Sequence, residues 1–188
     1  MNIIGRIFGR SDPHGVVRPL YMAVIQGARD PAWYREAGVA DTINGRFEAM
    51  CMLVCLLLLR LEREENRDRA DVLLTELFVT DMDGQLREAG VGDLMVGKHI
   101  GKMMSALGGR LGSMRSALAQ IAEGEEATAA LGPLLARNLH EGREEPAQKV
   151  QIAARRIAAI HDLLADKSLA EILAGDIAMD AVDQDMPS

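Results

Sequence analysis

The longest apolar run of the chain, Ala49–Leu59, constrains the fold more than any other feature. It reads AMCMLVCLLLL and has charged residues on both sides, among them Arg46 and Arg60. A membrane span needs about 20 apolar residues, so this run has roughly half of the required length. Residues 47–61 are apolar nearly all round a helix, which predicts a central helix enclosed by other helices.

The composition favours helices in the rest of the chain as well. Apolar residues make up 48% of the 188 residues but aromatic residues only 3%, so the core must consist of Leu, Ala, Val, Ile and Met. No segment alternates apolar and polar residues with the period of two that strands show. We therefore predict an all-α protein, an irregular bundle of about seven or eight helices around the apolar helix 47–61.

The spacing of apolar residues, together with capping residues, predicts the helix boundaries. The predicted helices are 19–28, a short turn at 32–37, a central helix from a cap at Asp41 or Thr42 to about Arg63, then 69–89, 94–107, 111–122, 127–140, 147–165 and 169–173. Glycine is unfavourable inside helices, so Gly90–Gly92 and Gly108–Gly109 are predicted to interrupt them. Pro133 is expected near the start of its helix or at a kink.

The two ends of the chain differ from the middle in charge. Residues 1–18 contain three arginines and one acidic residue and are predicted to be a flexible basic segment. This segment either binds weakly to a membrane surface or is a frayed terminus with one apolar face. Residues 174–188 are acidic without a basic residue and are predicted to be a disordered tail. Residues 19–173 between them are predicted to form a single helical domain.

Charge and residue types exclude several function classes. The net charge of −7 argues against specific DNA binding. Cys51 and Cys55 lie four residues apart in the apolar run, a poor geometry for a disulfide, so they are expected to be buried, reduced thiols of a cytoplasmic protein. The four histidines are scattered, and we expect no metal and no cofactor. No secretory signal is recognisable in the first residues.

Residues 78–101 contain two partial ligand motifs, and both fail on context. Gly92–Lys98 matches GxxxxGK, but a predicted helix rather than a strand precedes it, and His99 stands where a Ser or Thr is needed. Asp81–Gly84 begins like a calcium loop, but the glycine comes too early and the later ligands are absent. Neither motif predicts a phosphate or calcium site.

A local excess of basic residues follows. Lys98, Lys102, Arg110 and Arg115 lie between residues 94 and 122, where no acidic residue occurs. Such a patch can bind phosphates, anionic lipid headgroups or an acidic protein surface, or it can be an ordinary solvated helix face.

Glycines recur on the same stretch with helical spacing. Gly97 and Gly101 are four residues apart, as are Gly108 and Gly112. Each costs about 1 kcal/mol relative to alanine in a helix. We interpret them as sites of close approach by another helix or as a binding groove, with irregular turns as the alternative.

Four motifs resemble the ubiquinol–cytochrome c chaperone family. The longest is FxxDMDxxLREAGVGDLxVGK at residues 78–98. LYxxxxxxARxPxWY at 20–34 and GVADTINGRFE at 38–48 resemble the family's opening helices, and Arg137–Leu139 resembles its C-terminal Arg–Asn–Leu element. The resemblance covers residues 19–140.

The resemblance implies a helper protein rather than an enzyme. Mitochondrial relatives bind newly made cytochrome b near the ribosome exit, together with a small partner, and assist assembly of respiratory complex III. For this chain it implies a non-enzymatic assembly factor whose client is cytochrome b or another bc1 subunit. The ribosome or an anionic membrane surface would be a further partner, which places the protein in the cytoplasm, peripheral to the inner membrane.

The resemblance also focuses the search for a partner-binding surface. The candidates are Asp81, Asp83, Leu86, Arg87, Glu88, Val91, Asp93, Val96, Lys98 and Lys102. Leu86, Val91 and Val96 would line a groove, and the charged residues would surround it. The alternative function is a helical protein that binds heme or a small ligand, with His99 beside two methionines as the ligand.

Overall fold

The structure is a computed structural model that describes residues 12–88, 90 and 92–179, except for the side chains of Asp93 and Leu94. These residues form helices and no strand, so the predicted all-α class is confirmed. The α-helices are α1 (Arg18–Ala28), α2 (Pro31–Arg35), α3 (Ile43–Glu62), α4 (Ala70–Glu88), α5 (Asp93–Ala122), α6 (Ala127–Leu134), α7 (Ala147–Asp166) and α8 (Leu169–Ala174). The 3₁₀ turn η2 (Pro13–Val16) precedes α1, and the π-helix η3 (Leu135–Leu139) follows α6 directly after the turn that contains Pro133.

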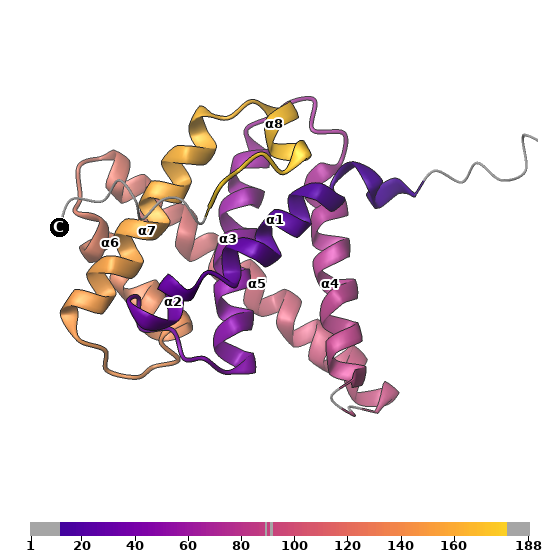
Figure 1. Cartoon of the computed structure of the whole chain (residues 1–188), viewed down its shortest axis with the longest axis horizontal. Helices are drawn as coiled ribbons and strands as arrows, with labels where there is room; N and C mark the ends of the chain where they lie inside the picture. Colours follow the sequence, from indigo (N-terminus) through magenta and orange to yellow (C-terminus); the bar gives the residue numbers. More distant parts are fainter. Residues whose placement is uncertain (1–11, 89, 91, 180–188) are drawn as a thin grey trace, which may run out of the picture.

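Helix α3 occupies the centre of the bundle, as predicted (Figure 1). Its cap is Thr42, whose hydroxyl accepts a hydrogen bond from the Gly45 amide at 3.0 Å. From Ala49 to Leu59 every residue except Met50 is buried. A helix buried on all sides needs neighbours all round, and α1, α4, α5 and α7 pack against it.

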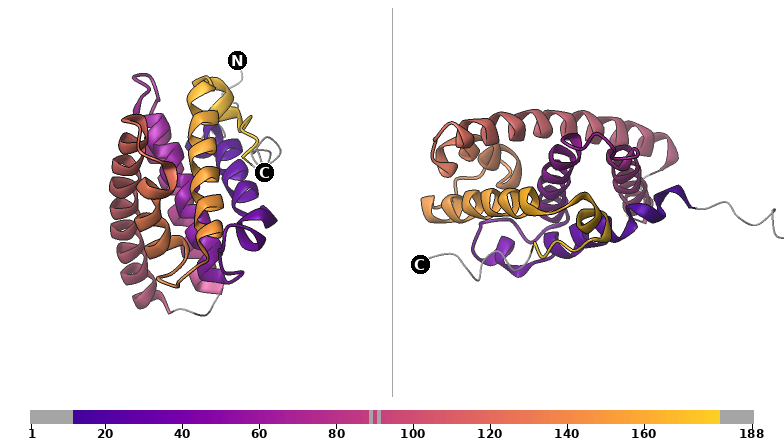
Figure 2. Two further views of the ribbon diagram at one scale, coloured as in Figure 1. Left: turned by 90° about the vertical axis from the view of Figure 1, so that its left-hand side faces the viewer. Right: turned by 90° about the horizontal axis from the view of Figure 1, so that it is seen from above.

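The other helices cover α3 in layers. Seen from above in Figure 2, α5 runs along one side of α3 and α4, while α1 and α8 lie on the opposite side. Helices α6 and α7 pack against each other, and α7 also packs against α3. Figure 1 shows α1 crossing α3 toward α4, and α1 packs against α3, α4 and α8.

Helix α5 corrects the prediction of a second glycine break. It runs without interruption through Gly108 and Gly109 for 30 residues. Leu107 and Met114 on either side of the glycines are buried in the core, and this packing outweighs a helix propensity cost of about 1 kcal/mol per glycine. The first predicted break is confirmed, because α4 ends at Glu88 and α5 begins at Asp93.

The folded domain extends beyond the predicted boundaries of 19 and 173. Val17 is fully buried, and His14 Nε2 lies 2.9 Å from a carboxylate oxygen of Glu76 on α4. At the other end, Ile177 and Met179 are buried in the core, and Met179 lies against Gly27 of α1. The remaining parts of the predicted flexible segment and tail, residues 1–11 and 180–188, lie outside the described residues.

A buried arginine holds the short helix α2 in place. Arg156 of α7 is fully buried, pairs with the carboxylate of Asp30, and lies 4.7 Å from the centre of the Trp33 ring. Asp30 also caps α2 by accepting a hydrogen bond from the Ala32 amide at 3.0 Å. The Trp33 indole donates to the Gly27 carbonyl at 3.0 Å, which fixes α2 against the end of α1.

Candidate functional site

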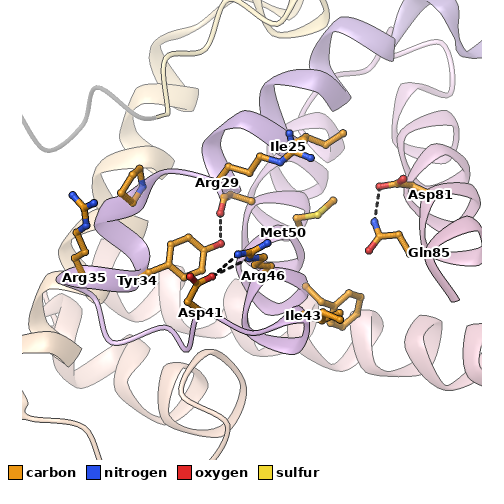
Figure 3. Close-up of a pocket in the computed structure, with 13 residues that line it drawn as sticks. Ile25, Arg29, Tyr34, Arg35, Asp41, Ile43, Arg46, Met50, Asp81 and Gln85 are labelled. Carbon is orange, nitrogen blue, oxygen red and sulfur yellow. Dashed lines mark hydrogen bonds and ion pairs between the residues drawn. The ribbon is translucent and has the colours of Figure 1, made fainter. Parts of the chain in front are cut away.

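An open groove lies between α1, α2, the first turns of α3 and the C-terminal half of α4 (Figure 3). We call it the α1–α4 groove. Its volume is about 990 Å³. Its lining residues are Ile25, Ala28, Arg29, Pro31, Tyr34, Arg35, Asp41, Ile43, Arg46, Phe47, Met50, Asp81 and Gln85. A concave surface that combines apolar side chains with a few polar groups is the usual form of a binding site.

Large apolar side chains that α1 and α3 leave uncovered form the floor of the groove. Ile25, Phe47 and Met50 are half-buried, and Ile43 is 82% exposed. Phe47 stacks on the buried ring of Phe78 with the ring centroids 6.0 Å apart, which fixes its position. Neighbouring apolar side chains left open to water in this way are typical of an interaction surface.

Arginines border the groove on the side of α1 and α2. Arg46 donates two hydrogen bonds to one oxygen of Asp41, at 2.7 and 3.0 Å, so its charge is compensated and its pKa is raised. Arg29 and Arg35 are exposed and form no ion pair with any residue in the described ranges. This side of the groove therefore carries two uncompensated positive charges.

The opposite wall is acidic and is tied to α1. Asp81 Oδ2 accepts a hydrogen bond from the Tyr21 hydroxyl at 2.7 Å and another from Gln85 Nε2 at 3.2 Å. Burial raises the pKa of Tyr21, and its hydrogen bond to Asp81 raises that pKa further, so the phenol stays protonated and donates. Figure 3 shows Asp81 and Gln85 across the groove from Arg29.

Among the predicted partner-binding residues of α4, Asp81 lines the groove and the others lie beyond it, nearer the helix end. Asp83 pairs with Arg87 one turn later, at 2.7 Å. Leu86 is half-buried and Glu88 is exposed.

The predicted residues around the start of α5 are dispersed. Val96 is 2% exposed, so it packs inside the protein and does not line an open groove as predicted. Lys98 and Lys102 are exposed and form no ion pair within the described part of the chain. Asp93 is the first residue of α5, and Val91 lies outside the described residues.

Of the four basic residues between 94 and 122, the two arginines are paired with acidic residues and are not part of a free basic patch. Arg110 pairs with Glu48 in a largely buried contact, with Nε and Oε2 2.9 Å apart, and burial raises the pKa of Glu48. Arg115 pairs with Glu62, with Nη2 and Oε2 2.8 Å apart. Both acids belong to α3, about 50 to 60 residues earlier, so inspection of residues 94–122 alone could not reveal them.

Of the interpretations of the α5 glycines, close approach by another helix is not supported. A Cβ atom at Gly97, Gly101, Gly108 or Gly112 would meet no atom within 4 Å, apart from the glycine's neighbours and its own helix. All four are exposed. They therefore form an open, smooth strip on α5, away from the other helices that the structure describes.

Of the residues that line the groove, Asp81 was predicted from the sequence and the others were not. Ile43 and Phe47 are four residues apart at the start of the central helix, where the helix emerges from the core. That spacing could have indicated the groove. Two large apolar residues one turn apart, next to the polar residues Thr42 and Arg46 and outside the enclosed run 49–59, predict an exposed apolar face. Much of the groove falls within the motifs at 20–34 and 38–48.

Other possible sites have less support. Within the described residues, no three His, Cys, Asp or Glu side chains are grouped so that they could hold a metal ion. Cys51 and Cys55 are buried free thiols, as predicted, and burial raises the pKa of Cys55 to about 12. His99, the predicted ligand of the alternative function, does not line the groove. A search of the described helices for a segment able to cross a membrane finds none.

Comparisons with known proteins agree with the resemblance. A sequence model of the family described as ubiquinol–cytochrome C chaperone matches residues 35–181. The crystal structure of the Cbp3 homolog from Brucella abortus is similar, with a TM-score of 0.76 and 29% sequence identity over 90% of this chain and 91% of that chain. No curated protein matches the sequence significantly.

Proposed function

Because the chain belongs to the ubiquinol–cytochrome c chaperone family, we propose that it is a non-enzymatic assembly factor that binds newly made cytochrome b in the α1–α4 groove. The observation that carries this assignment is the apolar floor of the groove, where Ile43 is 82% exposed beside Ile25 and Met50. A soluble protein gains nothing for its own stability from such exposure. A client with apolar helices is stabilised, because the groove shields their apolar surface from water until they are inserted into the membrane.

The dimensions of the groove are compatible with a helical client segment. A helix about 10 Å across occupies roughly 400 Å³ per turn, so a groove of about 990 Å³ holds roughly two turns. Amphipathic helices commonly bind in this way, with apolar residues one turn apart as anchors. Met50 suits such a role, because a flexible thioether adapts to differently shaped partners.

The binding cycle needs no chemical step. Holding a client requires an apolar surface, which the groove offers. The exposed end of α4 and Lys98 and Lys102 of α5 would then contact a second surface, either another part of the client, the ribosome or anionic lipid.

Site-specific photo-crosslinking tests the assignment in cells that assemble the reductase. A photoreactive residue at Ile43 should give an adduct with cytochrome b. The same residue at Val72 is the control, because Val72 is 40% exposed on α4 and does not line the groove. Position Met95, 48% exposed on α5, tests the second surface.

The possible outcomes are distinct. An adduct at Ile43 without one at Val72 supports client binding in the groove. An adduct at Met95 alone would move the client to the start of α5. If no position yields an adduct with a reductase subunit, and deletion of the gene leaves reductase levels unchanged, the proposed function is wrong.

A further inference from the structure

Some charged side chains around the groove have ion-pair partners and others have none. On the side of α1 and α2, Arg46 is compensated by Asp41, and the Tyr34 hydroxyl is already used as a donor to the Ala28 carbonyl at 2.6 Å. Arg29 and Arg35 line the same side and have no ion-pair partner among the described residues. Two guanidinium groups are therefore available to a ligand, Arg29 beside Ile25 and Arg35 at the edge of the groove beyond Tyr34 (Figure 3).

The facing wall carries one negative charge, that of Asp81, and it forms no ion pair with either arginine. Asp81 belongs to α4, and its Oδ2 already accepts hydrogen bonds from Tyr21 and Gln85. The groove is therefore polarised, with free donors along α1 and α2 and an engaged acceptor along α4. An occupant must match this polarity as well as the apolar floor.

We propose that the groove selects apolar helical segments that carry an acidic side chain on the side facing Arg29 and Arg35. This rests on the proposed function, because it specifies which client segments the same groove takes. Arginine binds a carboxylate through two parallel hydrogen bonds, which makes it selective for acidic groups. A carboxylate beside either arginine would be paired, whereas a basic group there would face a like charge.

The selectivity also has a physical use. An acidic residue within an apolar helix is costly to bury unpaired, so an unprotected segment of this kind is prone to misassembly. Either arginine would hold such a residue in a paired state while Ile43, Phe47 and Met50 cover the apolar face. The surface is thus suited to helices that are apolar but not uniformly so.

Binding of three matched peptides tests the selectivity. Each is a cross-linked helix of about 15 residues with the same apolar face and with Glu, Gln or Lys at one flanking position. Fluorescence anisotropy should show the Glu peptide binding about five-fold more tightly than the Gln peptide, with the Lys peptide weakest, as expected of solvent-exposed charge pairs. The double variant Arg29→Glu/Arg35→Glu should reverse the order.

A second double variant controls for net charge. Arg69→Glu/Arg155→Glu makes the same change in charge at two exposed positions that do not line the groove. It should keep the wild-type order of the three peptides. If it reverses the order equally, or if all three peptides bind alike to the wild type, the selectivity is overturned.

The test separates this inference from the proposed function. If the peptides bind alike but an Ile43 photo-crosslink to cytochrome b is still formed, the groove holds the client without charge selection. If vesicles of anionic lipid displace the Glu peptide while neutral vesicles do not, the arginines bind lipid headgroups and the inference is wrong. If no peptide binds and no crosslink forms, the proposed function fails as well.

Discussion

Replacing Ile43 with aspartate should greatly weaken client binding and leave the fold intact. Ile43 is 82% exposed, so only about a fifth of its side chain contributes to the core. Full burial of an isoleucine side chain contributes about 1.5–3 kcal/mol, so the substitution should cost about 0.5 kcal/mol of folding stability. Ile43 is also the first residue of α3, where a negative charge is favoured by about 0.3–1 kcal/mol through the helix dipole. The net change in the free energy of unfolding should therefore be close to zero.

The effect on binding should be much larger. If a client helix covers the exposed part of Ile43, the lost burial corresponds to about 2 kcal/mol, or roughly a 30-fold increase in Kd. The new carboxylate would also have to be desolvated against the apolar face of the client. The variant therefore uncouples binding from folding, which a core substitution cannot do.

Two measurements on the same protein check this reasoning. Urea unfolding monitored by circular dichroism gives the stability, and anisotropy with the Glu peptide or a cytochrome b segment gives the affinity. Val72→Asp is the matched control, since Val72 is the third residue of α4 and also partly exposed. Unchanged affinity in Ile43→Asp, or an equal loss in Val72→Asp, would refute the role of the groove floor.

Three further predictions concern stability and the second surface. Gly45→Ala should destabilise the protein by about 3 kcal/mol in urea unfolding, because a Cβ there collides with a carbonyl of the preceding loop. Gly108→Ala should stabilise it by about 1 kcal/mol in the same assay, because a Cβ at Gly108 faces open space. Hydrogen bonds at the α8 cap lower the pKa of Glu171 to about 2. The contribution of Glu171 to stability is therefore present above pH 4.5 and is lost as the pH falls toward 2. Glu171→Gln should flatten that part of an acid-unfolding profile. Lys98→Glu with Lys102→Glu should weaken client, ribosome or vesicle binding in pull-downs, and loss of the helical dichroism signal would show instead that these lysines are structural.

Local signals were sufficient to predict most of the helices. The enclosed helix α3 follows from its apolar run, and the caps at Asp30 and Thr42 follow from residue type and position. The continuous path of α5 through Gly108 did not follow, because the compensating contacts come from distant helices. Propensity is a weak preference of about 1 kcal/mol per glycine, and tertiary packing overrides it.

The candidate site depended on contacts that a linear pattern does not show. The pairings of Arg110 with Glu48 and of Arg115 with Glu62 join residues 62 and 53 apart, and together they remove half of what resembled a basic surface. The groove is likewise assembled from segments between residues 25 and 85. Charge patterns along one helix therefore indicated where charges occur but not which of them remain available for binding.

Asp81 belongs both to the motif at 78–98 and to the groove. Two substitutions can distinguish the role of its hydrogen bond from the role of its negative charge. It lines the groove and also accepts the Tyr21 hydrogen bond that joins α4 to α1. If its role is to hold these helices at the right spacing, Asp81→Asn should bind the client nearly as well as the wild type, since an amide oxygen still accepts from the phenol. Asp81→Ala should lose about 1 kcal/mol of stability and bind less tightly, because that acceptor is gone. Equal loss of affinity in both variants would contradict this, and would mean that the client itself requires the negative charge.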